Sequence, residues 1–305
     1  MKFCSQLLAL AVAQTSFMGA SAFMVQGPKA QSPVVVQSTY DALETGLASD
    51  FAGISGGLST RDSQIADMQF AKNIEELEIT RIQGGGALRT WSFQSPEVDR
   101  LMVAMTGEDR TLDTMTHEGR LMHARVYLCQ GPDNTPVRME IKSGKGKLRP
   151  FKAVIETPGG HSSLFIRNIG NIEFPITASV GAATADPGLA AAMGFMELSD
   201  GLYDMSTPRT LQGGAVVTYP LEPAVSGAKV VMKTDGRPLN ASIELVQGPN
   251  SIKFTIDLYT EDGIERPAFF VIPTPGAGNV IRIVNTAPVE FPLIVCVEPY
   301  MIESE

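Results

Sequence analysis

The residues from Gly119 to Val180 read GRLMHARVYLCQGPDNTPVRMEIKSGKGKLRPFKAVIETPGGHSSLFIRNIGNIEFPITASV, and this stretch occurs a second time in the chain. A shift of 117 positions places it on Gly236 to Val297 without a gap, and 21 of the 62 paired residues are identical. A repeat of this length predicts that the chain holds two copies of one folding unit. What two copies are for is therefore the first question that the sequence raises.

The residues that the two copies share are mostly turn formers, with a few long polar side chains among them. In the first copy they include Gln130, Gly131, Pro132, Arg149, Pro150, Pro158, Gly159, Asn168, Glu173, Phe174 and Pro175, and their counterparts are Gln247, Gly248, Pro249, Arg266, Pro267, Pro275, Gly276, Asn285, Glu290, Phe291 and Pro292. Glycine and proline end strands, because glycine permits unusual backbone angles and proline lacks a hydrogen-bond donor. We interpret the shared arginine and glutamate as a structural ion pair and the shared asparagine as a turn residue. These residues are predicted to define the fold and not to react.

Between these motifs, apolar and polar residues alternate with a period of two. Val126 and Leu128 alternate with Arg125 and Tyr127, and Ile166 belongs to a later run of the same kind. Such alternation is typical of strands that bury one face. We predict a mainly all-β chain of two tandem homologous modules, each a β-sandwich of six to eight short antiparallel strands. The 29 glycines and 20 prolines agree with many tight turns.

The order of composition along the chain predicts seven segments. They are a signal peptide over 1–22, a plastid transit-like and flexible segment over 23–58, a helical arm over 59–78, a first β module over 79–180, a linker over 181–205, a second β module over 206–297 and a C-terminal tail over 298–305. Ile65, Met68 and Ile74 give the arm an apolar stripe at helical spacing. Leu189 to Leu198 is predicted to form a short helix in the linker.

The N-terminal segment has the features of a cleavable leader. Lys2 precedes an apolar run, and Ala20-Ser21-Ala22 provides small residues for cleavage. Together with Phe23, this site resembles the A-S-A-F motif of plastid-targeted proteins in diatoms and their relatives. We therefore expect import into the plastid by a signal peptide followed by a transit segment. Secretion is the alternative, although secreted proteins more often use their cysteines in disulfides.

The sequence offers little for catalysis. A formal net charge of -9 disfavours a nucleic-acid partner, and no later run is apolar enough to span a membrane. His117, His123 and His161 all lie in the first copy, where His123 stands opposite Asn240 of the second. We find no spacing typical of a metal, cofactor or nucleophile site. We expect no catalytic, cofactor-binding or metal-binding residue, and we interpret Cys129 and Cys296 as reduced thiols.

The leader, the acidic helical arm and the motifs Q-G-P, R-P-F, T-P-G and E-F-P, which recur in order, resemble the pyrenoid shell proteins of diatoms. The resemblance covers roughly 79–297. The second copy departs from it at Ala268, where the phenylalanine of Arg149-Pro150-Phe151 is shifted to Phe269. The resemblance implies a structural protein that assembles with itself into a sheet around the Rubisco condensate, without enzymatic activity. Rubisco and related shell isoforms are the further partners that it implies.

The sequence predicts one candidate surface for each of two functions, assembly and ligand binding. Lys145 and Lys147 lie in the more basic first copy, so they are predicted to make assembly contacts with an acidic face of a neighbouring molecule. The alternative function is a tandem β-sandwich that binds a carbohydrate or another protein. That function needs an aromatic platform, for which Trp91 and Tyr219 are the recurring candidates.

Overall fold

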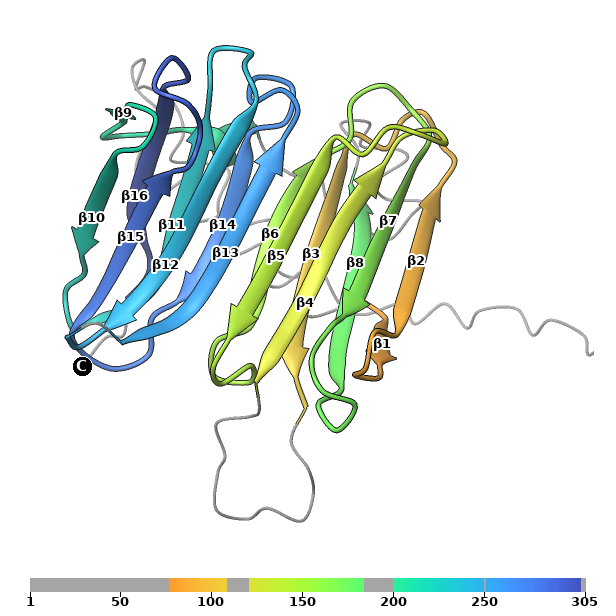
Figure 1. The fold of residues 1–305 in the computed structure, drawn as a ribbon, viewed down its shortest axis with the longest axis horizontal. Helices are drawn as coiled ribbons and strands as arrows, with labels where there is room; N and C mark the ends of the chain where they lie inside the picture. Colours follow the sequence, from red (N-terminus) through yellow and green to blue (C-terminus); the bar gives the residue numbers. More distant parts are fainter. Residues whose placement is uncertain (1–76, 109–120, 184–199, 250, 303–305) are drawn as a thin grey trace, which may run out of the picture. The chain divides into compact units, whose positions relative to one another are not determined.

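The computed structural model describes residues 77–108, 121–183, 200–249 and 251–302 of the chain. Within these residues the regular structure is sixteen β-strands and one short 3-10 helix, η1 (Asp200–Tyr203), and the strands form two eight-stranded antiparallel sheets (Figure 1). The predicted all-β class is therefore confirmed for the described residues. The predicted leader, the arm up to residue 76 and the predicted helix from Leu189 to Leu198 lie outside them.

The two sheets are named here the first sheet and the second sheet. Along the first sheet the strands are β1 (Ile79–Ile82), β8 (Ile176–Ala183), β3 (Arg100–Gly107), β6 (Phe151–Glu156), β14 (Ala268–Pro273), β11 (Val225–Lys233), β16 (Leu293–Ile302) and β9 (Arg209–Leu211). Along the second sheet they are β10 (Val216–Pro220), β15 (Asn279–Asn285), β12 (Leu239–Gln247), β13 (Ile252–Thr260), β5 (Val137–Ser143), β4 (Met122–Cys129), β7 (Ser162–Asn168) and β2 (Leu88–Phe93).

The two halves of this unit, β1 to β8 and β9 to β16, have the same strand order. The first half contributes β1-β8-β3-β6 to the first sheet and β2-β7-β4-β5 to the second. The second half contributes β9-β16-β11-β14 and β10-β15-β12-β13, which is the same order eight strands later. Eight strands in two packed sheets with these crossovers make a jelly roll. The shared order agrees with the sequence repeat, while the module boundaries at 79, 180, 206 and 297 stay predictions.

Both sheets run without interruption through the two halves. In the first sheet β6 pairs with β14, and in the second β5 pairs with β13. Ala153 lies opposite Phe270, which is its own counterpart in the repeat. In β5, Ile141 lies opposite Ile256 and Met139 opposite Leu258. Backbone hydrogen bonds therefore join the halves with an approximate two-fold relation.

The main core lies between the sheets and extends through both halves. In β4 the inward residues Val126 and Leu128 are fully buried, as the alternation predicts, and so is Ile166 of β7. Large apolar side chains of β13 and β14 belong to the same core. Burial of each such side chain stabilises the fold by about 1.5–3 kcal/mol. The core alone thus opposes separation of the halves.

A second apolar cluster covers the outer face of the first sheet. Val154 and Phe269, which pair across the join of the halves, belong to it together with Met102. Leu202 and Tyr203 of η1 pack on this cluster, and the Tyr203 ring meets the Phe269 ring edge-on with centroids 6.2 Å apart. The η1 segment therefore covers the join from outside. No helix in the described ranges is long and apolar enough to cross a membrane.

Candidate functional site

The polar residues that the two copies share lie either where the two halves join or at the outer part of each half. Gln130 and Gln247 end or directly follow β4 and β12, whereas Arg149 and Arg266 precede β6 and β14. These four residues meet where the halves join. Asn168 and Asn285 end β7 and β15 and lie at the outer part of each half, beside the Glu-Phe-Pro motifs.

At the join, the arginine of each half bonds to the glutamine of the other half. Nη2 of Arg149 donates to Oε1 of Gln247 over 3.0 Å, and Nη2 of Arg266 donates to Oε1 of Gln130 over 2.7 Å. The two hydrogen bonds are counterparts under the repeat, and both cross the join. We call this set of four residues the reciprocal clamp. It is the arrangement that the shared Gln-Gly-Pro and Arg-Pro motifs produce.

Each glutamine of the clamp is itself oriented by the Thr-Pro-Gly turn of its own half. Nε2 of Gln130 donates to the Pro158 carbonyl over 2.8 Å, and Nε2 of Gln247 donates to the Pro275 carbonyl over 3.2 Å. Gly131 has a φ of 80°, a left-handed conformation that glycine adopts without strain. The three shared motifs therefore act together, since turn, glutamine and arginine form one connected set.

The structure corrects one expectation about these residues. Arg149 was predicted to pair with a glutamate of the shared set, but its guanidinium donates to Gln247 of the other half, and Glu173 is exposed. Sequence reasoning missed this because the partners lie 98 positions apart and in different copies. The signal that could have found it is that Arg and Gln are shared by both copies in the same order.

The two arginines of the clamp are buried and only partly hydrogen bonded. Arg149 is 3% exposed and Arg266 is 7% exposed. Nε and Nη1 of Arg149 and Nε of Arg266 have no hydrogen-bond partner among the described residues. Burial lowers the pKa of the Arg149 guanidinium from its ordinary value. The two arginines differ in their neighbours, because Nη1 of Arg266 also has an ion pair with Glu265 at 3.3 Å.

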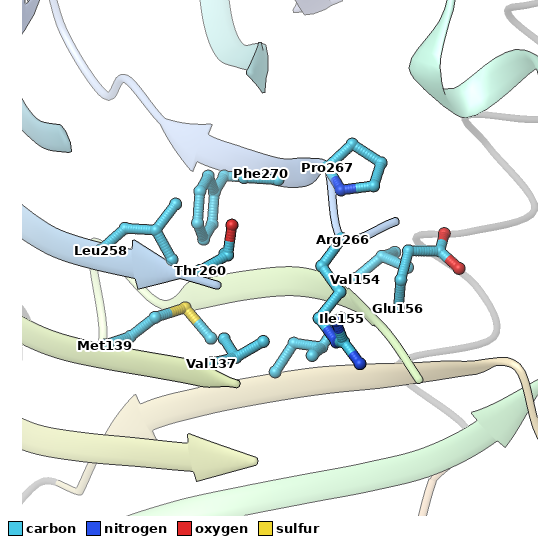
Figure 2. Close-up of a pocket in the computed structure, with 11 residues that line it drawn as sticks. Val137, Met139, Val154, Ile155, Glu156, Leu258, Thr260, Arg266, Pro267 and Phe270 are labelled. Atoms are coloured by element: carbon cyan, nitrogen blue, oxygen red, sulfur yellow. The ribbon is translucent and has the colours of Figure 1, made fainter. Parts of the chain in front are cut away.

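A small pocket lies beside Arg266, between β5, β13, β6 and β14 (Figure 2). Thr260, Arg266 and Glu156 border it, together with apolar side chains such as Leu258 and Phe270. Its volume of about 10 Å³ is about the least that holds one water molecule and is far below the several hundred Å³ of small-molecule sites. Thr260 Oγ1 also has no hydrogen-bond partner in the part of the chain that the structure describes. The geometry suits a bridging water at the join and not a substrate.

The shared asparagines fasten the outer connections of each half. Nδ2 of Asn168 donates to the carbonyls of Ile82 and Phe174 over 3.2 and 2.8 Å, and its Oδ1 accepts from Gly170 N. In the second half, Nδ2 of Asn285 donates to Leu211 and Phe291, and its Oδ1 accepts from Ala287 N. The set is the same in both halves, so the interpretation of these asparagines as turn residues agrees with the structure.

The candidate acid–base residues form a surface cluster. Nε2 of His123 lies 2.8 Å from Glu140 Oε1, and Arg125 and Lys142 contact the same carboxylate at 2.8 and 2.9 Å. Hydrogen bonds, above all the one from His123, lower the pKa of Glu140 to about 2. Such a carboxylate stays ionised and neutralises its neighbours on the outer face of β4 and β5. His161 is exposed in the β6–β7 connection, and His117 lies outside the described residues.

A buried ionic network on β11 and β16 was missed by sequence reasoning. Lys229 is 6% exposed, and its Nζ lies 2.9 Å from Glu298 Oε2. Ser206 donates to Glu298 Oε1 through its backbone N and its hydroxyl, and Cys296 donates through its thiol over 3.1 Å. Burial would raise the pKa of Glu298, but these bonds outweigh it and lower the pKa to about 2. The network fastens Ser206, just after η1, to β16.

The thiols and aromatic residues singled out from the sequence have structural surroundings. Cys129 and Cys296 are free, the former half-buried and the latter buried, with a pKa raised by burial and by its bond to Glu298. Trp91 and Tyr219 pack partly against the core, and the Arg209 guanidinium lies 5.1 Å from the centre of the Tyr219 ring. Their inward packing does not form an open aromatic platform.

Comparisons with known proteins point to one family. Residues 72–299 match the model of the family described as diatom pyrenoid shell protein. No curated protein matches the sequence. Among solved structures, the PBSX exported protein XepA is similar at 7% identity and a TM-score of 0.21, over 72% of this chain and 85% of that chain. Hazelnut (Corylus avellana) vicilin is similar at 10% identity and a TM-score of 0.16, over 74% of this chain and 84% of that chain.

Proposed function

The chain belongs to the diatom pyrenoid shell protein family, and we propose on this basis that it is a structural subunit that assembles with copies of itself into a sheet around the Rubisco condensate. The family is one of shell proteins of the plastid pyrenoid. In this role the chain supports carbon dioxide fixation by enclosing the enzyme, without carrying out a reaction. Contact with Rubisco and co-assembly with related shell proteins are parts of the same proposal.

The observation that carries the proposal is the arrangement of the sheet ends. The halves join through β5–β13 and β6–β14, so each sheet ends in one strand from each half, with β1 and β9 ending the first sheet and β10 and β2 the second. Within the described residues, each of these end strands pairs on one side only. A subunit with related but non-identical ends can repeat without closing on itself, which is what an extended sheet requires.

The use of the shared polar side chains supports the same role. The duplicated glutamines, arginines and asparagines all bond within the fold, at the reciprocal clamp or at the outer connections. A reaction centre inherited by both halves would instead leave matched ionisable groups facing an open cleft. The duplication therefore favours a construction unit over a duplicated catalyst.

Electron microscopy of the purified protein tests the proposal. We expect sheets or tubes to form above a threshold concentration, with a repeat set by one chain or a small group of chains. Sedimentation of the same samples gives the fraction assembled. Discrete single chains at every salt and crowding condition would contradict the proposal and favour the alternative of a binding module.

The route to the plastid is a separate proposal with its own test. A fusion of residues 1–58 to a fluorescent protein is expected to enter the plastid of a diatom cell. The Phe23→Ala fusion is expected to stop on the secretory route, because the residue after the predicted cut directs onward transport. Secretion of both fusions would show that the leader addresses the protein outside the cell.

A further inference from the structure

Each half of the structure has one corner where two chain connections pack on each other. In the first half, the β1–β2 connection meets the β7–β8 connection, and Gly86 N donates to the Asn168 carbonyl over 2.8 Å. In the second half, the β9–β10 connection meets the β15–β16 connection, and Gly214 N donates to the Asn285 carbonyl over 2.8 Å. We call these the first corner and the second corner.

Both corners are rigid for the same reasons. A side chain at Gly84 would overlap the Asn171 carbonyl, and one at Gly213 would overlap the Pro288 carbonyl, so the connections approach as closely as glycine allows. The buried amide of Asn168 or Asn285 holds the far side of each corner with three hydrogen bonds. A side chain at the tip of such a corner is presented in a fixed position.

Exposed aliphatic side chains stand at matched positions of the two corners. Ile172 is 67% exposed at the tip of the first corner, and its counterpart Val289 is 69% exposed at the tip of the second. Leu88 and Val216, which begin the matched edge strands β2 and β10, are also exposed. By contrast, the exposed Ile264 has Lys147 as its counterpart, so the repeat did not keep an apolar residue there.

The fold does not account for these matched aliphatic residues. Side chains this exposed add little to the stability of the chain, and most positions of the repeat have diverged, since only 21 of 62 pairs are identical. Apolar side chains fixed on a rigid tip have the properties of interface anchors, which gain their free energy when a partner covers them. Two such tips on one chain indicate two contacts of the same kind.

The charges around the tips indicate what the partner is. Glu173 and Glu290 directly follow the aliphatic tips and are exposed. In the first corner, Arg81 Nη1 donates to Gln83, whose amide donates to the Ile172 carbonyl. In the second corner, Arg237 donates to the Glu290 carbonyl. Arg81 is also held in an ion pair with Glu108 at 2.7 Å, whereas Arg237 approaches Asp235 only to 3.7 Å. The first corner therefore offers the carboxylate of Glu173 and the second corner offers the guanidinium of Arg237, so the two corners can complement each other.

We propose that the first corner of one copy binds the second corner of the next copy, with Ile172 and Leu88 packed against Val289 and Val216 and with Glu173 facing Arg237. The inference rests on the proposed function and names the surface that would link the subunits. β2 and β10 lie at opposite ends of the second sheet, so one chain offers both halves of the contact. Such a head-to-tail contact continues from copy to copy without closing.

The first test replaces one tip at a time in the full chain. Ile172→Asp and Val289→Asp are each expected to raise the concentration at which assembly begins by about tenfold or more, the effect of losing one interface anchor. Ile252→Asp is the matched control, since it places the same charge on an exposed isoleucine whose counterpart is Thr135 and which pairs with Val246, at the other end of β12 from the second corner. It is expected to assemble like the parent. Circular dichroism and melting temperature should be the same for all four proteins, because none of the three side chains is buried.

The second test mixes the two corner variants. The contact needs one intact first corner and one intact second corner, so below the raised threshold concentration neither variant alone makes it. An equimolar mixture of Ile172→Asp and Val289→Asp can make it once, and analytical ultracentrifugation is expected to show a pair of chains that grows no further. Pairs formed as readily by either variant alone would overturn the proposal, because the contact would then join like corners.

The outcomes separate the two proposals. If the parent protein forms no assembly at all, the proposed shell function fails and the corner contact fails with it. If the parent assembles and the Ile172→Asp and Val289→Asp variants assemble at the same concentration, only the corner contact is wrong. If the variants lose assembly and keep their fold while Ile252→Asp behaves like the parent, the corner contact is supported.

Discussion

The two halves of the chain share the residues that connect strands and halves, and they differ in the residues on the outer face of the first sheet. Both keep the arginine and glutamine of the reciprocal clamp and the buried asparagine of the corner. On the outer face of the first sheet, however, Met102 pairs with Gly181 in the first half, whereas Lys229 pairs with Glu298 in the second. After the duplication, the residues that connect strands and halves have therefore stayed the same, whereas the residues on the outer face of the first sheet have diverged.

This difference matters for a protein proposed to repeat in a sheet. Because the connecting residues are the same in both halves, the halves fold in the same way and pair with each other with an approximate two-fold relation. Different faces give one chain two distinguishable sides, so that an ordered sheet has a fixed direction. Predictions that compare a residue with its own counterpart test this division most directly.

The largest effect is expected from a charge in the shared core. Ile166→Asp and Ile283→Asp alter matched residues that are both fully buried. Each is expected to lower the free energy of unfolding by about 3–5 kcal/mol, because an unpaired carboxylate is buried and the packing is lost. Since the sheets are continuous, both variants should unfold the two halves in one denaturant transition.

The control for this comparison is Arg167→Asp, on the same strand but exposed. Its stability should change little, because Arg167 lies opposite Arg125 and the change removes a like-charge contact. Two separate transitions in Ile166→Asp, one of them with the parent's midpoint, would show that the halves are independent and that the shared sheets do not couple them.

The next effect concerns the network that only the second half has. The pKa of Glu298 is about 2 in the folded chain and about 4.5 in a free side chain. A carboxylate with a lowered pKa contributes stability that is present above pH 4.5 and is lost as the pH falls toward 2. The parent should therefore lose up to about 3 kcal/mol more over this range than Glu298→Gln does.

Glu140→Gln is the comparison for that measurement, since the pKa of Glu140 is also about 2 but its partners are more exposed. Solvent screens such surface pairs, so this variant should alter the pH dependence less. Urea unfolding at several pH values measures both. An equal change in the two variants would show that the Glu298 network is no better shielded from water than the surface cluster.

Removing either glutamine of the reciprocal clamp should lower the free energy of unfolding by a similar amount. Gln130→Leu leaves Arg266 without its partner across the join, and Gln247→Leu does the same to Arg149. Each is expected to cost about 1–3 kcal/mol, the range for a buried donor that loses its acceptor. Chemical denaturation of both variants measures the loss. A large effect in one and none in the other would show that the two hydrogen bonds are not equivalent.

The sequence predicted the core residues and the strand ends, because these depend on the alternation of apolar residues and on the repeat. Alternation placed Val126 and Ile166 in the core, and the matched glycines and prolines marked the strand ends. It did not predict that Arg149 bonds to Gln247, because the partner of a buried side chain depends on which strands join across the halves. A lysine within an apolar run, such as Lys229, indicates a buried charge that needs an acidic partner. The residues around Lys229 in the sequence do not indicate that this partner is Glu298.

The smallest effect on stability, with a measurable effect on assembly, is predicted for the basic residues of the β5–β6 connection. Lys145 is half-buried and Lys147 exposed, and the counterparts of these lysines in the second half are Asp262 and Ile264. Lys145→Glu with Lys147→Glu is expected to leave the melting temperature within a few degrees of the parent's and to weaken assembly. The weakening should be greatest at low salt, because charges at an interface rim act through screened fields. Sedimentation of parent and variant across a salt series measures it, and identical curves would remove these lysines from the contact while leaving the corner contact untouched.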